Sequence, residues 1–182
     1  CTSSTKAIKA FQYFNGYQTG GRITNINDEL YLTIGDYNDW KAPQQHNRNV
    51  GKIVLINSVS GKSKIISKGH RNPQGLYVYS KEKRLLIATE HGPKGGDEIN
   101  LIYIDKPLNQ NNFGWPIASY GNHYDAVPIN SFTRKYAPLK KKSYFKYFIE
   151  PIFYFKESIG ISEIIKKNNS TDNKYIVTSL KN

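Results

Sequence analysis

The sequence predicts an all-β protein assembled from many short strands. Its apolar runs are short, rich in β-branched and aromatic residues, and bounded by Gly, Asn, Asp or Pro. Aromatic residues make up 13% of the chain, and 14 residues are tyrosine, which suits strands better than disorder. Regularly spaced short strands are typical of a sandwich, a barrel or a propeller. No tandem repeat is evident, but the blades of a propeller can diverge beyond recognition.

The individual strands follow from apolar runs that end at turn residues. Gly35 and Asp36 end the first run, and Asn57 and Ser58 end the second. A charged turn at residues 80–84 separates two runs that form a predicted hairpin. In chain order, the expected strands are residues 30–34, 52–56, 64–66, 76–79, 85–89, 99–104, 151–155 and 175–180.

Two regions depart from this pattern. Residues 162–167 are the only helix candidate of note, although the isoleucines there also fit a strand. Residues 109–150 form a long polar connection with no clear strand, and loops of that length are usually functional or disordered. Because this connection contains Trp115 and several tyrosines, we expect it to be ordered.

Length and composition indicate one globular domain. The 182 residues, 38% of them hydrophobic, are enough for a core. No apolar stretch approaches the roughly 18 residues of a membrane helix, and no signal peptide is visible. A single cysteine excludes a disulfide framework and a multi-cysteine zinc site. Since Met is absent and the chain starts at Cys1, we expect a processed or excised segment, although Cys-Thr-Ser-Ser also resembles a mature lipoprotein start.

The formal net charge of +12 favours either an anionic partner or a compositional bias. Nucleic-acid surfaces enlist arginine for bidentate phosphate contacts. Here lysine greatly outnumbers arginine, and the charge is scattered apart from the run Lys140, Lys141 and Lys142. The bias is therefore the better explanation, and we expect no nucleic-acid partner.

The densest polar motif is GHRNPQG at residues 69–75. Asn-Pro initiates turns, and the flanking glycines permit a tight backbone path. Such a turn displays Arg71, Asn72 and Gln74 together, which suits a planar, oxygen-rich anion. The alternative is a surface turn whose polar side chains cap their own backbone.

A second motif, EHGPKGGDE at residues 90–98, lies between two expected strands. Its glycines and proline expose backbone carbonyl groups, and Asp97 and Glu98 add carboxylates. Hard oxygen ligands on a flexible loop are what Ca²⁺ prefers, although the spacing is not that of an EF-hand. The alternative is a glycine-rich hairpin with a solvated acidic pair. The four histidines of the chain are too dispersed to suggest a zinc hydrolase.

These motifs and several others occur in the order found in one known family. They are GGRI at 20–23, LYLTIGD at 30–36, GHRNPQG at 69–75, EHGPKGGDEINLI at 90–102 and FGWPIASYG at 113–121. Together they resemble the soluble quinoprotein sugar dehydrogenases of the glucose/sorbosone dehydrogenase family, whose aldose dehydrogenases use pyrroloquinoline quinone (PQQ). The resemblance is collinear over most of the chain, and its motifs are long.

The resemblance implies a six-bladed β-propeller. A four-stranded blade takes roughly 40 to 50 residues, so six blades need at least about 240. The chain can supply about three to four blades, and we expect residues 1–182 to be an internal portion of a single propeller domain. The family also implies a periplasmic or other extracytoplasmic location.

The resemblance further implies the residues that meet the cofactor. In the family, a hydride passes from the sugar to the quinone, and the protein removes the hydroxyl proton and polarises the quinone. Arg71 matches the arginine that polarises the quinone, and Asn72 matches a hydrogen-bond donor to the cofactor. His91 lies at the edge of the cofactor region.

Two calcium sites are implied in the same way. The carbonyl groups of Gly92 and Pro93 match positions that bind the Ca²⁺ anchoring the cofactor. Glu98, together with the carbonyl group of Phe113, resembles a second, structural Ca²⁺ site.

One position departs from the family pattern. The proton acceptor of the family is a histidine four residues before the arginine of the GGR segment. That arginine is Arg22, and Gln18 stands four residues before it. Glutamine has no useful basicity near neutral pH, so Gln18 cannot accept the hydroxyl proton as an imidazole does.

These observations favour an enzyme without excluding a binding protein. Arg71, Asn72 and the loop at 92–98 favour a PQQ- and Ca²⁺-dependent oxidoreductase that takes electrons from aldose sugars and passes them to an acceptor. Gln18 at the catalytic position favours the alternative, a non-catalytic Ca²⁺-binding propeller that binds a sugar or a protein partner. A different enzyme on the same scaffold, such as a lactonase, is the third hypothesis.

Overall fold

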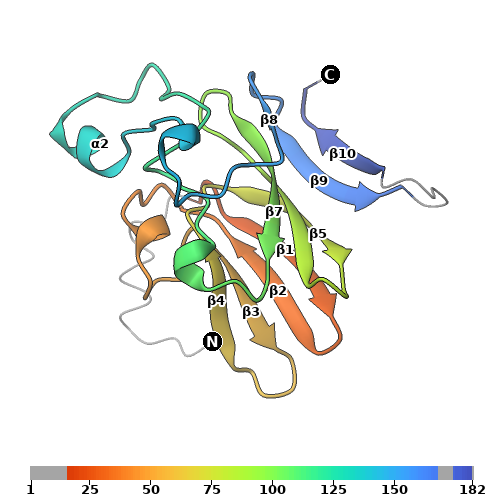
Figure 1. The fold of residues 1–182 in the computed structure, drawn as a ribbon. Helices are drawn as coiled ribbons and strands as arrows, with labels where there is room; N and C mark the ends of the chain where they lie inside the picture. The colour runs from red at the N-terminus through yellow and green to blue at the C-terminus, as the bar shows by residue number, and fades with distance from the viewer. Residues whose placement is uncertain (1–15, 168–173, 182) are drawn as a thin grey trace.

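The fold is known from a computed structural model that describes residues 16–167 and 174–181. Within these residues the strands form three antiparallel sheets, and one short α-helix, α2 (Ser131–Tyr136), lies in a connection (Figure 1). The prediction of an all-β protein is therefore confirmed. Cys1, which resembles a lipoprotein start, lies outside the described residues. None of the helices in the described part of the chain is long and apolar enough to cross a membrane.

Each sheet follows the order of the chain. The first sheet consists of β1 (Gly20–Ile26), β2 (Glu29–Ile34), β3 (Lys52–Asn57) and β4 (Ser63–Lys68). The second sheet consists of β5 (Pro73–Ser80), β6 (Leu85–Glu90), β7 (Asp97–Tyr103) and β8 (Phe153–Phe155). The third sheet consists of β9 (Ile161–Lys166) and β10 (Tyr175–Ser179). Neighbouring strands pair antiparallel throughout, although the connections from β2 to β3 and from β7 to β8 are long.

The three sheets pack as consecutive propeller blades. Their first strands, β1, β5 and β9, contact one another in that order, and the later strands of each sheet follow by pairing. Two blades have four strands, and the described part of the third has two. The described residues thus hold two complete blades and part of a third, which is consistent with a partial propeller.

The structure decides two local points that the sequence left open or missed. Residues 162–167 form a strand and not a helix, because β9 pairs with β10 and packs against β5, where Ile161 and Ile164 are buried. Strand β1 was not expected, because its sequence GGRITNI lacks a continuous apolar run. Its pairing with β2 is irregular near the glycines, where the Thr33 hydroxyl accepts hydrogen bonds from the backbone of Gly21 and Arg22.

The main core lies between the two four-stranded sheets. Each sheet turns one side of its alternating pattern inward, and apolar side chains from both meet there. The buried members are Ile26, Tyr31, Ile53, Leu55, Ile66, Leu76, Leu86, Ala88, Ile102, Ile104 and Phe113. Burial of this interface fixes the two sheets relative to each other, and with them the loops at their ends.

The long connection between β7 and β8 is ordered, as predicted. It contains η2 (Leu108–Gln110), α2 and η3 (Lys142–Tyr144), and it brings Phe113 and Trp115 into buried positions beside the first sheet. The side chain of Asn111 donates hydrogen bonds to the carbonyl groups of Ile66 and Tyr103, at 2.6 and 2.8 Å, which ties the connection to both blades.

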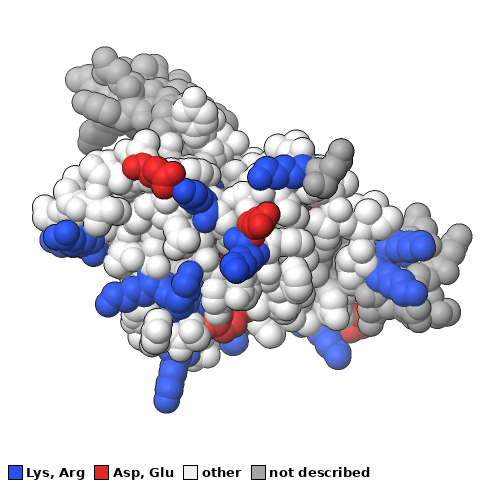
Figure 2. Space-filling view, turned by 90° about the horizontal axis from the view of Figure 1, so that it is seen from above, with Lys and Arg blue, Asp and Glu red and all other residues white. Residues whose placement is uncertain are grey.

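The positive charge does not gather on the face shown in Figure 2. Lysine and arginine side chains lie scattered over it, with fewer aspartate and glutamate side chains among them. Several cations are paired, including Arg48 with Asp39 at 2.6 Å and Lys94 with Asp125 at 2.8 Å. This arrangement agrees with a compositional origin of the net charge of +12.

We expect residues 1–182, expressed alone, to form oligomers or aggregates. Ile152 and Phe153 beside the second sheet, and Ile165 and Ile176 of the third, are exposed apolar side chains next to sheet edges. Such surfaces associate in water. Light scattering and calorimetry measure the outcome, and a monodisperse monomer that unfolds cooperatively would contradict this expectation.

Candidate active site

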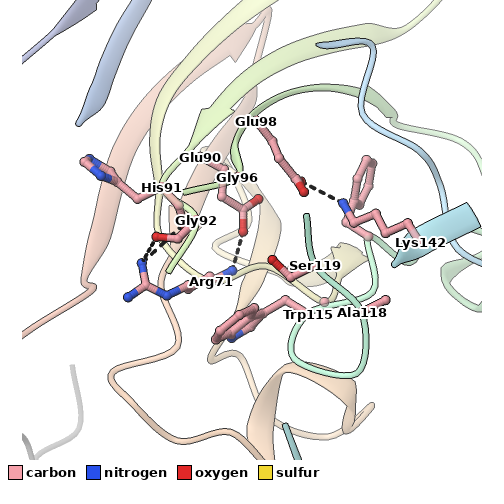
Figure 3. Close-up of a pocket in the computed structure, with 12 residues that line it drawn as sticks. Arg71, Glu90, His91, Gly92, Gly96, Glu98, Trp115, Ala118, Ser119 and Lys142 are labelled. Atoms are coloured by element: carbon pink, nitrogen blue, oxygen red, sulfur yellow. Dashed lines mark hydrogen bonds and ion pairs between the residues drawn. The ribbon is translucent and has the colours of Figure 1, made fainter. Parts of the chain in front are cut away.

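The two polar motifs of the sequence meet in one pocket at the junction of the two four-stranded sheets (Figure 3). The turn from β4 to β5 contributes Arg71, and the loop from β6 to β7 contributes His91 and Gly92. Arg71 Nη1 donates to the carbonyl oxygen of Gly92 at 2.7 Å and to that of His91 at 3.3 Å. The backbone N–H of Arg71 also donates to the carboxylate of Glu90.

Close backbone approaches explain two of the glycines in these motifs. Gly69 has φ +75°, and a Cβ there would press on the backbone nitrogen of Gly114 at 2.7 Å. Gly96 has φ +72°, and a Cβ there would collide with the backbone of Gly121. Because only glycine adopts this conformation without strain, both positions let the long connection close over the pocket.

Arg71 is held on several sides. Its side chain is largely buried, and its guanidinium carbon lies 5.5 Å from the centre of the Trp115 ring. With the amide oxygen of Gln18 turned toward it, Arg71 Nη2 donates to that oxygen at 2.8 Å. The backbone carbonyl of Arg71 accepts a hydrogen bond from the N–H of Asp36 at 2.8 Å. The guanidinium is therefore fixed in position before any ligand binds.

Gln18 lies between this cation and a buried carboxylate. In the same amide orientation its nitrogen donates to Asp36, which also accepts hydrogen bonds from Trp115 Nε1 at 2.7 Å and from the backbone of Asn38 at 2.9 Å. Burial raises the pKa of Asp36 to about 6, against the opposing effect of these hydrogen bonds and of Arg71. In the sequence, Asp36 is the turn residue that ends a strand and the LYLTIGD motif, and neither feature predicts a role in the site.

Of the other two predicted cofactor residues, His91 lines the pocket, whereas Asn72 is not among the residues that line it. The side-chain oxygen of Asn72 accepts hydrogen bonds from Gln74 Nε2 at 2.8 Å and from the backbone of Gly20 at 3.1 Å. Because these two hydrogen bonds occupy the side-chain oxygen of Asn72, a ligand would contact its amide nitrogen. Burial lowers the pKa of His91, which favours its neutral form near pH 7.

A buried charged network underlies the pocket. Glu90 accepts a hydrogen bond from His70 Nδ1 at 2.9 Å, and His70 Nε2 lies 2.8 Å from the hydroxyl of Ser67. Burial opposes ionisation of Glu90, but His70 and the backbone of Arg71 together bring its pKa below the ordinary value. Glu90 therefore anchors the turn that carries Arg71.

The carbonyl groups expected to bind calcium face different partners. The carbonyl oxygen of Gly92 accepts a hydrogen bond from Arg71 Nη1. The carbonyl oxygen of Pro93 accepts hydrogen bonds from the hydroxyl groups of Tyr124 and Ser158, both at 3.2 Å. The carboxylate of Asp97 accepts a hydrogen bond from the backbone N–H of Gly92 at 3.0 Å, and others from the backbone of residues 159–161, where the chain enters β9. Asp97 thus shapes the loop and is not available as a free ligand.

Glu98 and Phe113 line the inner end of the same pocket. The carboxylate of Glu98 accepts hydrogen bonds from Lys142 Nζ at 2.7 Å and from Asn100 Nδ2 at 3.1 Å. The ring of Phe113 stacks on that of His70 with centroids 4.8 Å apart. Lys142 belongs to η3, and its place in a run of three lysines gave no sign of a buried role.

The chain is similar in sequence to known proteins. The sequence model of the glucose/sorbosone dehydrogenase family matches residues 8–182. The aldose sugar dehydrogenase YliI of Escherichia coli (strain K12) is 30% identical over 161 residues, which cover 81% of this chain and 40% of that protein.

Solved structures give the same result. The soluble aldose sugar dehydrogenase of Escherichia coli in its apo-form matches with a TM-score of 0.70 and 29% identity, over 89% of this chain and 48% of that one. The PQQ-bound aldose sugar dehydrogenase of Streptomyces coelicolor matches with a TM-score of 0.53 and 27% identity, over 80% of this chain and 38% of that one. The chain thus spans less than half the length of these relatives. Over the matched part it has the fold of their propellers. The chain belongs to the glucose/sorbosone dehydrogenase family.

Proposed function

We propose that this chain forms the part of a sugar dehydrogenase that binds and polarises a PQQ cofactor. The observation that carries the proposal is the fixed guanidinium of Arg71, which Gln18, Trp115 and the carbonyl of Gly92 hold at the pocket. A relative of the chain is named for its PQQ-bound form, which supports the same cofactor here. The substrate class, an aldose, follows from the names of the relatives.

The proposed roles follow from the chemistry of each side chain. When bound, PQQ supplies the centre that accepts a hydride from the sugar carbon. Arg71 stabilises negative charge that develops on an oxygen next to it, and its fixed position means that little reorganisation is needed. The amide nitrogen of Asn72 donates a hydrogen bond to the ligand, and neutral His91 lies beside the ligand at the rim.

Calcium at the carbonyl groups of Gly92 and Pro93 is the second part of the proposal. Carbonyl oxygens are suitable ligands for Ca²⁺, but two of them fall short of the six to eight oxygens it takes. In addition, the cation of Arg71 already lies 2.7 Å from the oxygen of Gly92. A calcium ion held by these two carbonyl groups would therefore need further oxygen ligands, which the bound cofactor would supply.

Gln18 supports a second candidate function, a propeller that binds a ligand without oxidising it. The side chain bridges Arg71 and Asp36, and the family resemblance assigns its position to the base. An amide in this place donates and accepts hydrogen bonds but does not take up a proton near neutral pH. The electron acceptor and a location outside the cytoplasm remain predictions from the family resemblance.

The experiment is a titration of the natural full-length protein with PQQ, in Ca²⁺ and in EGTA. We expect saturable changes in quinone absorbance and in tryptophan fluorescence, and weaker binding in EGTA. Asn72→Ala should weaken binding by about tenfold, the usual effect of one lost hydrogen bond. Asn47→Ala, at an exposed position, is the matched control.

The outcomes separate the two candidates. Binding that is saturable but gives no sugar oxidation supports the non-catalytic candidate. If PQQ does not bind in either buffer, the cofactor assignment to Arg71 and Asn72 is wrong.

A further inference from the structure

We propose that the ammonium group of Lys142 takes the place of a calcium ion at Glu98, so that this end of the pocket carries a built-in cation. The family resemblance implies a structural Ca²⁺ at Glu98 and Phe113, and the residues present do not fit one. The inference concerns the stability of the blade and does not depend on sugar oxidation or on PQQ.

Two buried carboxylates create the need for a cation. Glu90 and Glu98 are both almost fully buried, and Asn100 Nδ2 lies 3.4 Å from the first and 3.1 Å from the second. Two like charges that share one hydrogen-bond donor in a low-dielectric interior raise the free energy of the fold unless a positive charge lies close by. The carboxylate of Glu90 accepts hydrogen bonds from His70 and from the backbone of Arg71, so Glu98 is the carboxylate that still needs a positively charged partner.

Lys142, in the long connection between β7 and β8, supplies this positive charge. Its side chain is 2% exposed, and Nζ lies 2.7 Å from Glu98 Oε2 (Figure 3). The turn η3 brings it there, next to Ala118 and Ser119 on the pocket wall. The lysine thus joins the connection to strand β7 by one buried ion pair.

The same position does not suit calcium. Ca²⁺ binds carboxylate oxygens at about 2.3–2.6 Å and takes six to eight oxygen ligands. It would have to share one carboxylate with an ammonium group already 2.7 Å away, and the two cations would repel each other. Among the described residues, no group of three or more His, Cys, Asp or Glu side chains could hold a metal ion.

The test counts calcium ions bound by the natural full-length protein without PQQ. Isothermal titration with CaCl₂ compares the wild type with Lys142→Ala, and melting is followed in EGTA and in millimolar Ca²⁺. We expect Lys142→Ala to bind one more calcium ion than the wild type. Its melting temperature in EGTA should fall by at least about 5 °C, because a buried carboxylate loses its partner, and Ca²⁺ should restore part of the loss.

Two further variants make the result decisive. Lys146→Ala, at an exposed position four residues away, should bind calcium and melt as the wild type does. Glu98→Gln should bind as many calcium ions as the wild type, because Glu98 holds none. This second comparison decides the matter if Lys142→Ala does not fold.

The proposal fails on either of two results. One is a wild-type calcium site that is lost in Glu98→Gln. The other is a folded Lys142→Ala protein that binds no additional calcium.

Discussion

Replacement of Arg71 by alanine will lower dye-linked oxidation of aldoses by about 10³-fold in protein loaded with PQQ and Ca²⁺. The guanidinium is the cation that the pocket holds rigidly, through the carbonyl of Gly92, the ring of Trp115 and the amide of Gln18. Loss of one fixed donor to a developing oxyanion commonly costs 10²- to 10³-fold in rate, and loss of its charge adds to this. Steady-state dye reduction with purified protein measures the effect.

Two controls identify the cause. Arg71→Lys keeps the charge but loses the planar fork that contacts Gly92 and Gln18 together, so its activity should stay at least about tenfold below the wild type. Arg48→Ala removes an exposed arginine paired with Asp39 and should leave the rate unchanged. If Arg71→Ala retains most of the activity while binding PQQ, Arg71 does not stabilise the transition state.

Gln18→His should raise aldose oxidation by at least about tenfold, with little change in PQQ affinity. The side chain at position 18 lies between Arg71 and the buried carboxylate of Asp36. An imidazole there would have a carboxylate to orient it and would supply the base that glutamine lacks, a contribution commonly worth about 10²- to 10⁴-fold. The same dye-reduction assay, run over a range of pH, measures the gain.

The pH dependence distinguishes a new base from a general improvement. A histidine acts as a base only when it is neutral, so the rate of Gln18→His should rise with pH as the imidazole loses its proton. The negative charge of Asp36 raises the pKa of such an imidazole, while Arg71 opposes this effect. Gln45→His, at an exposed position, should show neither the gain nor the new pH dependence. A wild type as fast as Gln18→His would show that another residue is the base.

The strands with continuous β-branched runs were predictable because their pattern is local. Residues 52–56 and 85–89 fall within strands β3 and β6, where nearly every side chain is buried or half-buried. Strand β1 was missed because its side chains alternate between exposed and half-buried, and β9 was ambiguous because short apolar runs fit either structure. For both, pairing and packing against a neighbouring strand decide the conformation.

The candidate site also contains some residues that the sequence could predict and others that it could not. The motifs at residues 69–75 and 90–98 are contiguous in sequence, so Arg71, Asn72, His91 and Gly92 could be named without a structure. Asp36 and Lys142 could not, because their roles depend on contacts across 35 or more positions, to Arg71 in one case and to Glu98 in the other. Nothing in the neighbouring sequence of either residue marks a buried charge.

The sequence by itself determined that the protein is built from short strands, that it belongs to this family, and which loops carry the polar motifs. It did so because strand periodicity and motif spacing are properties of residues close together in the chain. Only the tertiary structure decided that Gln18 bridges Arg71 and Asp36, and that Lys142 neutralises Glu98. Those outcomes depend on burial, since a charge inside the fold has to find its partner among the residues that packing brings within reach.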